Sequence, residues 1–182
     1  MSDNTLDFDV VIPNKNEEDF IDQALALGYK EIVFLTKDIN YIKPLTTKIS
    51  VKTAYLIKES LEISRARKKY DYIFAMAERK YFELNIDFIV GAESSDRKDS
   101  FHYKATSLNQ VHAELAKKNN ITLVFNFNKL VSDPVSTKGK MLQNALLIKK
   151  YKLKHSIFSL AVDPCMMRSR EVLNALGNIL GL

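Results

Sequence analysis

Residues 121–127 read Ile-Thr-Leu-Val-Phe-Asn-Phe, a nearly continuous apolar run that is rich in β-branched and aromatic side chains. Such a run is typical of a strand that is covered on both faces. A helix-type segment precedes it at 107–118, and a second, basic one follows it and ends at Tyr151. Another short apolar run comes next, at 156–161. This order predicts parallel strands joined by crossover helices.

The same pattern extends outward from this stretch to the beginning of the chain. Five further apolar runs lie at 8–12, 32–35, 53–57, 72–77 and 86–90, with helix signals between several of them. No Gly-x-Gly-x-x-Gly or Gly-Lys-Ser/Thr sequence is present, so a nucleotide-binding open sheet loses its main support. We therefore expect one domain over residues 1–182. Its predicted fold is α/β and TIM-barrel-like, a parallel β/α barrel of about seven strand–helix units.

Charge is distributed unevenly between the two halves of the chain. Residues 1–90 hold 13 Lys and Arg against 15 Asp and Glu, a net of −2, whereas residues 91–182 hold 14 against 7, a net of +7. A basic half gains affinity for a polyanion by releasing condensed counterions. A solvated lysine-rich helix face would give the same counts, so both interpretations stay open at this point.

The amino-acid composition favours a globular domain without a membrane span. The 182 residues are 46% hydrophobic and 27% charged, as in a globular domain, and no apolar run is long enough to span a bilayer. The start of the chain is polar and acidic, unlike a signal peptide. The single cysteine, Cys165, excludes an internal disulfide. We expect a cytoplasmic protein, or a nuclear one if the source is eukaryotic, with no membrane partner.

The sequence offers little for catalysis of its own. Its three histidines, His102, His112 and His155, form neither His-x-His nor His-Glu-x-x-His, so we expect no metal site and no cofactor. His112 lies on an apolar helix stripe, which indicates a satisfied core or interface residue. Cys165 is flanked by apolar residues and is interpreted as a small hydrophobe in a turn. We therefore predict no catalytic residues.

Basic residues at the ends of predicted strands and helices are the better candidates for a binding site. The longest polar loop, 94–104, contains Arg97, Lys98 and Lys104 and follows a predicted strand. Two further pairs of basic residues, Lys138 with Lys140 and Arg168 with Arg170, lie near the starts of predicted helices, where an anion is favoured. The predicted RNA-binding residues are Arg97, Lys98, Lys104, Lys138, Lys140, Arg168 and Arg170. The structural alternative for Arg97 and Arg168 is an internal ion pair, with Asp96, Asp99 or Asp163 as the candidate partners.

The order of these segments resembles one known family. An Arg97-Lys98-Asp99 loop is followed by a 107–118 helix, the 121–127 strand, a helix ending Lys149-Lys-Tyr151 and a turn with Arg168. In this order, the chain is similar to the thirty-kilodalton protein subunit of archaeal and eukaryotic ribonuclease P, protein component 3 in archaea. The resemblance is clearest from residue 86 to residue 182.

That resemblance implies a barrel without catalytic activity of its own. Members of the family assist the catalytic RNA that removes the 5′ leader from precursor tRNA, and they pair with a small ferredoxin-like subunit. Carried over by position, Arg97, Lys98 and Arg168 match basic positions that are implicated in RNA function. The expected partners are therefore ribonuclease P RNA, precursor tRNA and the ferredoxin-like subunit, in a hetero-oligomer.

The chain also departs from the family pattern. Residues 78–85 form a shortened helix, residues 100–106 look inserted, and the usual tail after the last Leu-Gly run is absent. The short helix and the absent tail leave open whether the barrel closes completely. Two rival hypotheses are a small-molecule enzyme acting at the strand ends of the barrel, against which the net charge of +7 in the second half argues, and a metal-dependent phosphoesterase of similar barrel fold. In that class the first strand carries His-x-His, whereas here it reads Asp7-Phe8-Asp9, which we interpret as acids solvated at a strand edge.

Overall fold

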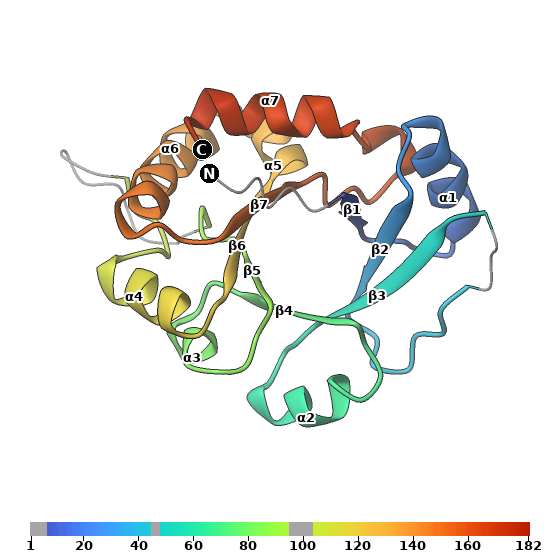
Figure 1. Cartoon of the computed structure of the whole chain (residues 1–182), viewed down its shortest axis with the longest axis horizontal. Coiled ribbons are helices and arrows are strands. Elements are labelled where there is room, and N and C mark those ends of the chain that lie inside the picture. The colour runs from blue at the N-terminus through green and yellow to red at the C-terminus, as the bar shows by residue number, and fades with distance from the viewer. Residues whose placement is uncertain (1–6, 45–47, 95–103) are drawn as a thin grey trace.

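Seven parallel strands form a ring in the computed structural model, which describes residues 7–44, 48–94 and 104–182. The strands follow one another around the ring in chain order, each paired with the next, as Figure 1 shows. They are β1 (Phe8–Val11), β2 (Glu31–Thr36), β3 (Ser50–Leu56), β4 (Tyr72–Met76), β5 (Phe88–Val90), β6 (Thr122–Asn126) and β7 (His155–Phe158). Each overlaps one of the seven apolar runs, with ends that differ by up to three residues, so the predicted strands and the α/β barrel class are confirmed.

Helices surround this ring on the outside (Figure 1). The long ones are α1 (Glu17–Ala26), α4 (Gln110–Lys118), α6 (Pro134–Tyr151) and α7 (Arg170–Leu180). Short ones are α2 (Ile63–Ala66), α3 (Arg79–Phe82), α5 (Phe127–Ser132) and the 3₁₀ turns η1 (Ser60–Glu62) and η2 (Pro164–Met166). The described parts of the connection from β2 to β3, residues 37–44 and 48–49, contain no helix, unlike the predicted strand–helix unit. The predicted short helix in 78–85 is confirmed as α3.

The ring is nearly closed between its first and last strands. Beyond β7 the chain makes one parallel bridge to β1, between Val11 and Ala161. The N–H of Leu160 donates to the carbonyl of Val10 (3.0 Å), and the N–H of Ile12 donates to the carbonyl of Ala161 (2.8 Å). Two main-chain hydrogen bonds therefore join the ends of the sheet, where the other strand pairs have longer ladders.

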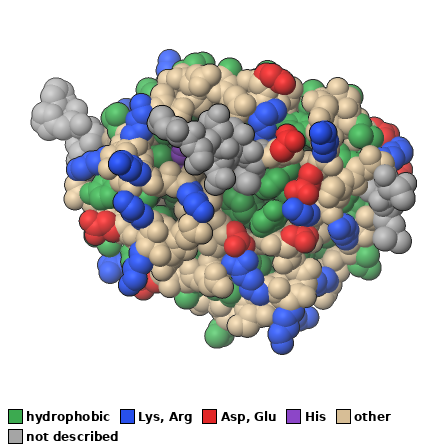
Figure 2. Space-filling view, in the orientation of Figure 1, with side chains coloured by type: hydrophobic (Ala, Val, Ile, Leu, Met, Phe, Trp, Pro, Cys, Tyr) green, Lys and Arg blue, Asp and Glu red, His purple; other side chains and the backbone are tan. Residues whose placement is uncertain are grey.

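The inside of the barrel is filled by its own strands. One cluster of buried apolar side chains takes members from all seven strands and none from a helix, and it includes Phe8, Phe74, Phe88 and Phe158. The rings of Phe8 and Phe158 stack at 5.4 Å, and those of Phe74 and Phe88 at 4.7 Å. On the face seen in Figure 2, apolar side chains gather at the centre and charged ones surround them. Side chains of alternate residues point outward and pack under the helices.

None of the described helices is both long enough and apolar enough to cross a membrane.

Candidate nucleic-acid interface

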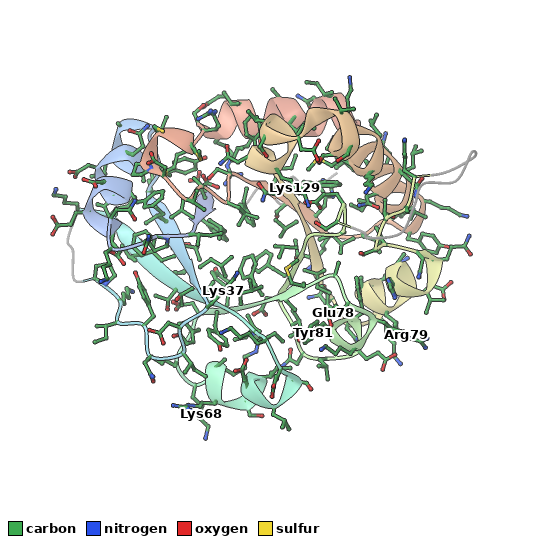
Figure 3. All side chains as sticks on the ribbon, turned by 180° about the vertical axis from the view of Figure 1, so that it is seen from behind. Lys37, Lys68, Glu78, Arg79, Tyr81 and Lys129 are labelled. Atoms are coloured by element: carbon green, nitrogen blue, oxygen red, sulfur yellow. The ribbon has the colours of Figure 1, made fainter. Side chains whose placement is uncertain are left out.

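Polar and charged side chains collect where the strands end, as is usual in β/α barrels. Lys37 directly follows β2, Glu78 follows β4, and Lys129 lies in the first turn after β6. Figure 3 shows these three residues around the middle of the barrel, whereas Lys68 lies on the outer rim beside α2. The strand ends thus bring together residues that are far apart in the sequence.

Three of the predicted RNA-binding residues lie together on the start of α6. Lys138 and Lys140 flank Gly139 in the second turn of that helix, and Lys104 packs against the same place. A Cβ atom added to Gly139 would lie 3.4 Å from both Cγ and Cε of Lys104. Lys104 and Lys138 are exposed and Lys140 is half-buried. We call Lys104, Lys138 and Lys140 the basic patch.

The sequence fixes the start of α6 through a capping residue. The carboxylate of Asp133 accepts hydrogen bonds from the hydroxyl and the main-chain N–H of Ser136. These bonds, led by the one from the hydroxyl, hold the pKa of Asp133 below its usual value. Because the cap defines the first turn, it also sets the direction in which Lys138 and Lys140 leave the helix.

A fourth cation, Lys129, is placed near this end of the barrel by α5. The side chain of Asn126 accepts a hydrogen bond from the N–H of Lys129 (3.0 Å) and so caps the helix. The Lys129 ammonium donates to Oγ of Ser94 and lies 4.0 Å from Oε1 of Glu93. Sequence reasoning counted Lys129 only as part of the basic half. Its place three residues beyond a buried strand was the signal that could have selected it.

Glu93 is an unusual neighbour for that lysine. Its side chain is 1% exposed, and neither carboxylate oxygen has a hydrogen-bond partner among the described residues. Burial raises the pKa of the carboxyl group, and Lys129 offsets the shift only in part. The carboxyl group nearest to Lys129 is therefore one whose charged form is disfavoured by burial.

Arg168 and Arg170 lie apart from the basic patch and are bound within the fold. Nη1 of Arg168 donates to the carbonyls of Cys165 (2.9 Å) and Met167 (2.7 Å), and its guanidinium lies 5.8 Å from the ring centre of Phe127. Nη2 of Arg170 donates to the carbonyl of Phe8. The sequence suggested an ion pair with an aspartate as the structural role of Arg168, and main-chain carbonyls take that place. Binding of RNA by either arginine stays a prediction.

Arg97 and Lys98 fall outside the described residues, as do Asp96, Asp99 and His102. Their predicted contact with RNA therefore also stays a prediction.

The interpretation of Asp7 and Asp9 as solvated strand-edge acids is wrong for Asp9. Asp7 is exposed, but Asp9 is completely buried. Oδ1 of Asp9 accepts hydrogen bonds from the N–H groups of Val10 (2.9 Å) and Ser159 (2.8 Å), while Oδ2 has no partner among the described residues. Burial, the largest influence, raises the pKa of Asp9 to about 6. Strand alternation explains the difference, because Phe8 and Val10 face into the barrel and Asp9 faces the layer under the helices.

The histidines that the structure describes do not gather into a metal site. His112 is buried, its Nδ1 lies 2.7 Å from the carbonyl of Ser107, and its ring stacks on Phe82 at 4.6 Å, which confirms it as a satisfied core residue. His155 is half-buried at the start of β7. Within 7–44, 48–94 and 104–182, no three His, Cys, Asp or Glu side chains are close enough together to hold a metal ion.

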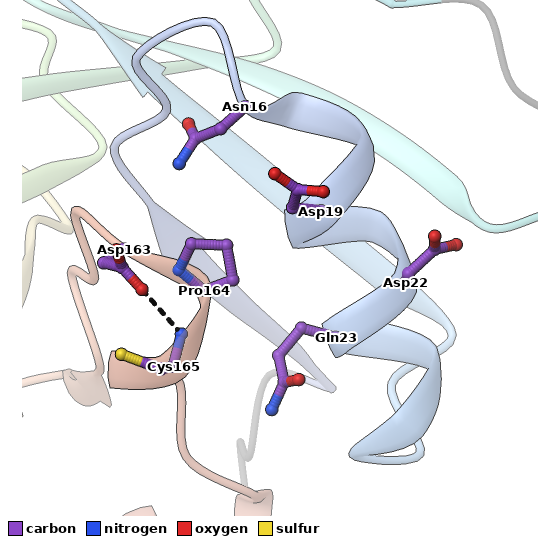
Figure 4. Close-up of a pocket in the computed structure, with 7 residues that line it drawn as sticks. All are labelled: Asn16, Asp19, Asp22, Gln23, Asp163, Pro164 and Cys165. Carbon is purple, nitrogen blue, oxygen red and sulfur yellow. Dashed lines mark hydrogen bonds between the residues drawn. The ribbon is translucent and has the colours of Figure 1, made fainter.

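A groove between α1 and η2 contains the only cysteine of the chain, as Figure 4 shows. Three carboxylates line it together with Cys165, namely those of Asp19, Asp22 and Asp163. Cys165 is exposed in the η2 turn, and its hydrogen bond with Asp163 raises the pKa of the thiol. A thiol with a raised pKa is a poor nucleophile, and the acidic lining repels phosphate. The groove is therefore an unfavourable place for both nucleophilic chemistry and RNA.

Comparison with known proteins gives a match at the level of structure. No protein-family model matches the sequence, and no curated protein is similar to it in sequence. A chain in the cryo-EM structure of archaeal ribonuclease P with mature tRNA has a similar fold, with a TM-score of 0.75. The match covers 96% of this chain and 82% of that chain, at 19% sequence identity. At this identity the similarity establishes the shared fold.

Proposed function

We propose that the protein is a non-catalytic subunit of ribonuclease P that binds and scaffolds the catalytic RNA during removal of the 5′ leader from precursor tRNA. The observation that carries the proposal is the shared fold over almost the whole chain with a protein from the archaeal enzyme. The order of sequence segments from residue 86 onward supports the same family independently. Fold alone does not determine function, so the proposal also depends on the surface of this chain.

The basic patch supports RNA as the ligand. Lys104 packs over Gly139, the residue between Lys138 and Lys140 in the chain, and all three lysines belong to the half of the chain with a net charge of +7. The three lysines come from the start of a helix and from an adjoining loop, and none of the described helices is placed so that it could enter a groove of the RNA and contact base edges. Such lysines are suited to binding phosphates. RNA would therefore be recognised through its backbone at this site.

The phosphoesterase hypothesis has less support. It requires several convergent metal ligands, and none of the described residues form such a set. Asp9, which occupies the strand that carries His-x-His in that class, is buried and binds main-chain N–H groups. We therefore propose that the chain has no hydrolytic activity by itself.

A protein partner is proposed for the outer face of α6. Leu142 and Leu146 are four residues apart, so they lie on one face of the helix, and they are 38% and 69% exposed. Adjacent exposed leucines on a helix are typical of a surface that another protein covers. We propose that the ferredoxin-like subunit of ribonuclease P binds here.

Co-purification tests the proposal directly. The tagged protein is isolated from its source cell, and the RNA and proteins that accompany it are sequenced. Recovery of ribonuclease P RNA with a ferredoxin-like protein is the expected result. Recovery of neither, together with Mn²⁺- or Zn²⁺-dependent cleavage of a phosphoester by the purified chain, would favour the phosphoesterase instead.

A further inference from the structure

Gln143 joins the segment that carries Lys104 to α6. The main-chain N–H of Lys104 donates to Oε1 of Gln143 (2.9 Å), and Nε2 of Gln143 donates to the main-chain carbonyl of Lys104 (2.7 Å). One side-chain amide thus binds both polar main-chain groups of a single residue, as a neighbouring strand would. The two residues are 39 positions apart in the chain, so this pair of bonds is a long-range attachment.

Gly139 contributes to the holding of Lys104 by leaving room for its side chain on α6. Gly139 and Gln143 are four residues apart and therefore share one face of α6. The stem of Lys104 lies over Gly139, where an added Cβ would approach its Cγ and Cε to 3.4 Å. Gln143 fixes the main chain of Lys104 and Gly139 leaves room for its side chain. These two residues of α6 together hold Lys104 against the helix.

We propose that Gln143 is a positioning residue for RNA binding. It acts by holding Lys104 against α6, next to the turn that carries Lys138 and Lys140. This inference rests on the proposed function and names the residue that assembles its binding surface. Without the two hydrogen bonds, the segment around Lys104 would have to be ordered when RNA binds, and that loss of conformational freedom opposes binding. Attachment to α6 removes this cost in advance, as preorganised binding surfaces do.

Gln143→Met is the variant that tests the attachment. Methionine has a similar length and no charge, but it can neither accept from nor donate to the main chain of Lys104. Binding of a fluorescein-labelled transcript of ribonuclease P RNA from the source cell is measured by anisotropy over a series of KCl concentrations. We expect about fivefold weaker binding, a loss of roughly one unit of salt slope and little change in melting temperature.

Gly139→Leu is a second variant that leaves the hydrogen-bonding groups of Gln143 in place. Leucine has a higher helix propensity than glycine, so α6 should be no less stable. Its side chain would occupy the space of the Lys104 stem, and binding should weaken as in Gln143→Met. Weaker binding by a protein of equal or greater stability cannot be attributed to unfolding.

A double-mutant cycle separates positioning from a general structural role. Lys104→Ala should weaken binding about fivefold in the unaltered chain and hardly at all in the Gln143→Met background. Lys138→Ala, the matched control, should cost the same in both backgrounds. An equal loss from Lys104→Ala in both would overturn the inference and leave the proposed function intact. Absence of salt-dependent binding by the unaltered chain would overturn both.

Discussion

A buried carboxyl group lies where β1, the first strand of the barrel, meets the chain just beyond β7, the last strand; we call this junction the seam. Asp9 binds the N–H of Ser159, just beyond β7, and so helps to attach the last strand to the first. Charged or titratable groups that interact with this region are Arg170 of α7, Tyr29 before β2, Glu171 and the exposed Asp7, and Arg170 offsets only part of the effect of burial. The pKa of Asp9 in the folded protein, about 6, thus lies above its ordinary value of 3.8.

This shift predicts how stability changes with pH. Between pH 4 and 6 the folded protein keeps the proton of Asp9 while the unfolded chain loses it, so raising the pH favours unfolding. The contribution of Asp9 is full below about pH 4 and is lost as the pH rises through 6, on the order of 2 to 3 kcal/mol in the free energy of unfolding. Asp9→Asn should remove this part of the pH dependence in urea titrations. Asp7→Asn, at an exposed position, is the control, and equal curves for the two variants would contradict the prediction.

Arg168 should contribute to stability, because its guanidinium holds two carbonyls of the η2 turn. We expect Arg168→Ala to lower the free energy of unfolding by about 1 to 2 kcal/mol, since hydrogen bonds to a charged group are stronger than average but this one is partly exposed. Lys138→Ala removes an exposed charge and should have almost no effect. Chemical denaturation compares the two. If Arg168→Ala unfolds like Lys138→Ala but binds RNA less tightly, the arginine faces RNA instead.

At the scale of elements, α6 combines the basic patch with the exposed leucines. If RNA phosphates contact the patch, Lys138→Ala and Lys140→Ala should each reduce the slope of log affinity against log salt by about one unit, at unchanged stability. Lys68→Ala provides the comparison, because Lys68 is, like Lys138, an exposed lysine, and it lies on the outer rim by α2 (Figure 3). A slope change of the same size for Lys68→Ala would indicate diffuse attraction without a defined site.

The strands were easier to predict than the interactions of the basic residues. Runs such as 121–127 are apolar on both faces because interior and helix layer both bury them, and this composition is visible in the sequence. The attachment of Lys104 to Gln143 is a contact between distant segments, and no local pattern marks it. The hydrogen bonds from Arg168 to main-chain carbonyls could not be predicted either. Every residue has a carbonyl, so such acceptors produce no pattern in the sequence.

For the whole molecule, the aromatic interior should be the main source of stability. Phe158 is completely buried, stacks on Phe8 at 5.4 Å and meets Phe88 edge to face at 5.9 Å. It stands on β7, next to the seam, the junction of β1 and the end of β7, where two main-chain hydrogen bonds between described residues close the ring. Packing inside the barrel therefore has to hold β1 and β7 together where the ladder is short.

Phe158→Ala should lower the free energy of unfolding by about 3 to 5 kcal/mol, because it removes a buried ring and leaves a cavity that the surrounding strands cannot fill. Leu146→Ala, at a side chain that is 69% exposed, should change stability by less than about 0.5 kcal/mol. Urea unfolding of both variants measures the contrast. A loss below about 1 kcal/mol for Phe158→Ala would mean that the barrel interior can repack freely, and that closure of the ring depends on the seam hydrogen bonds instead.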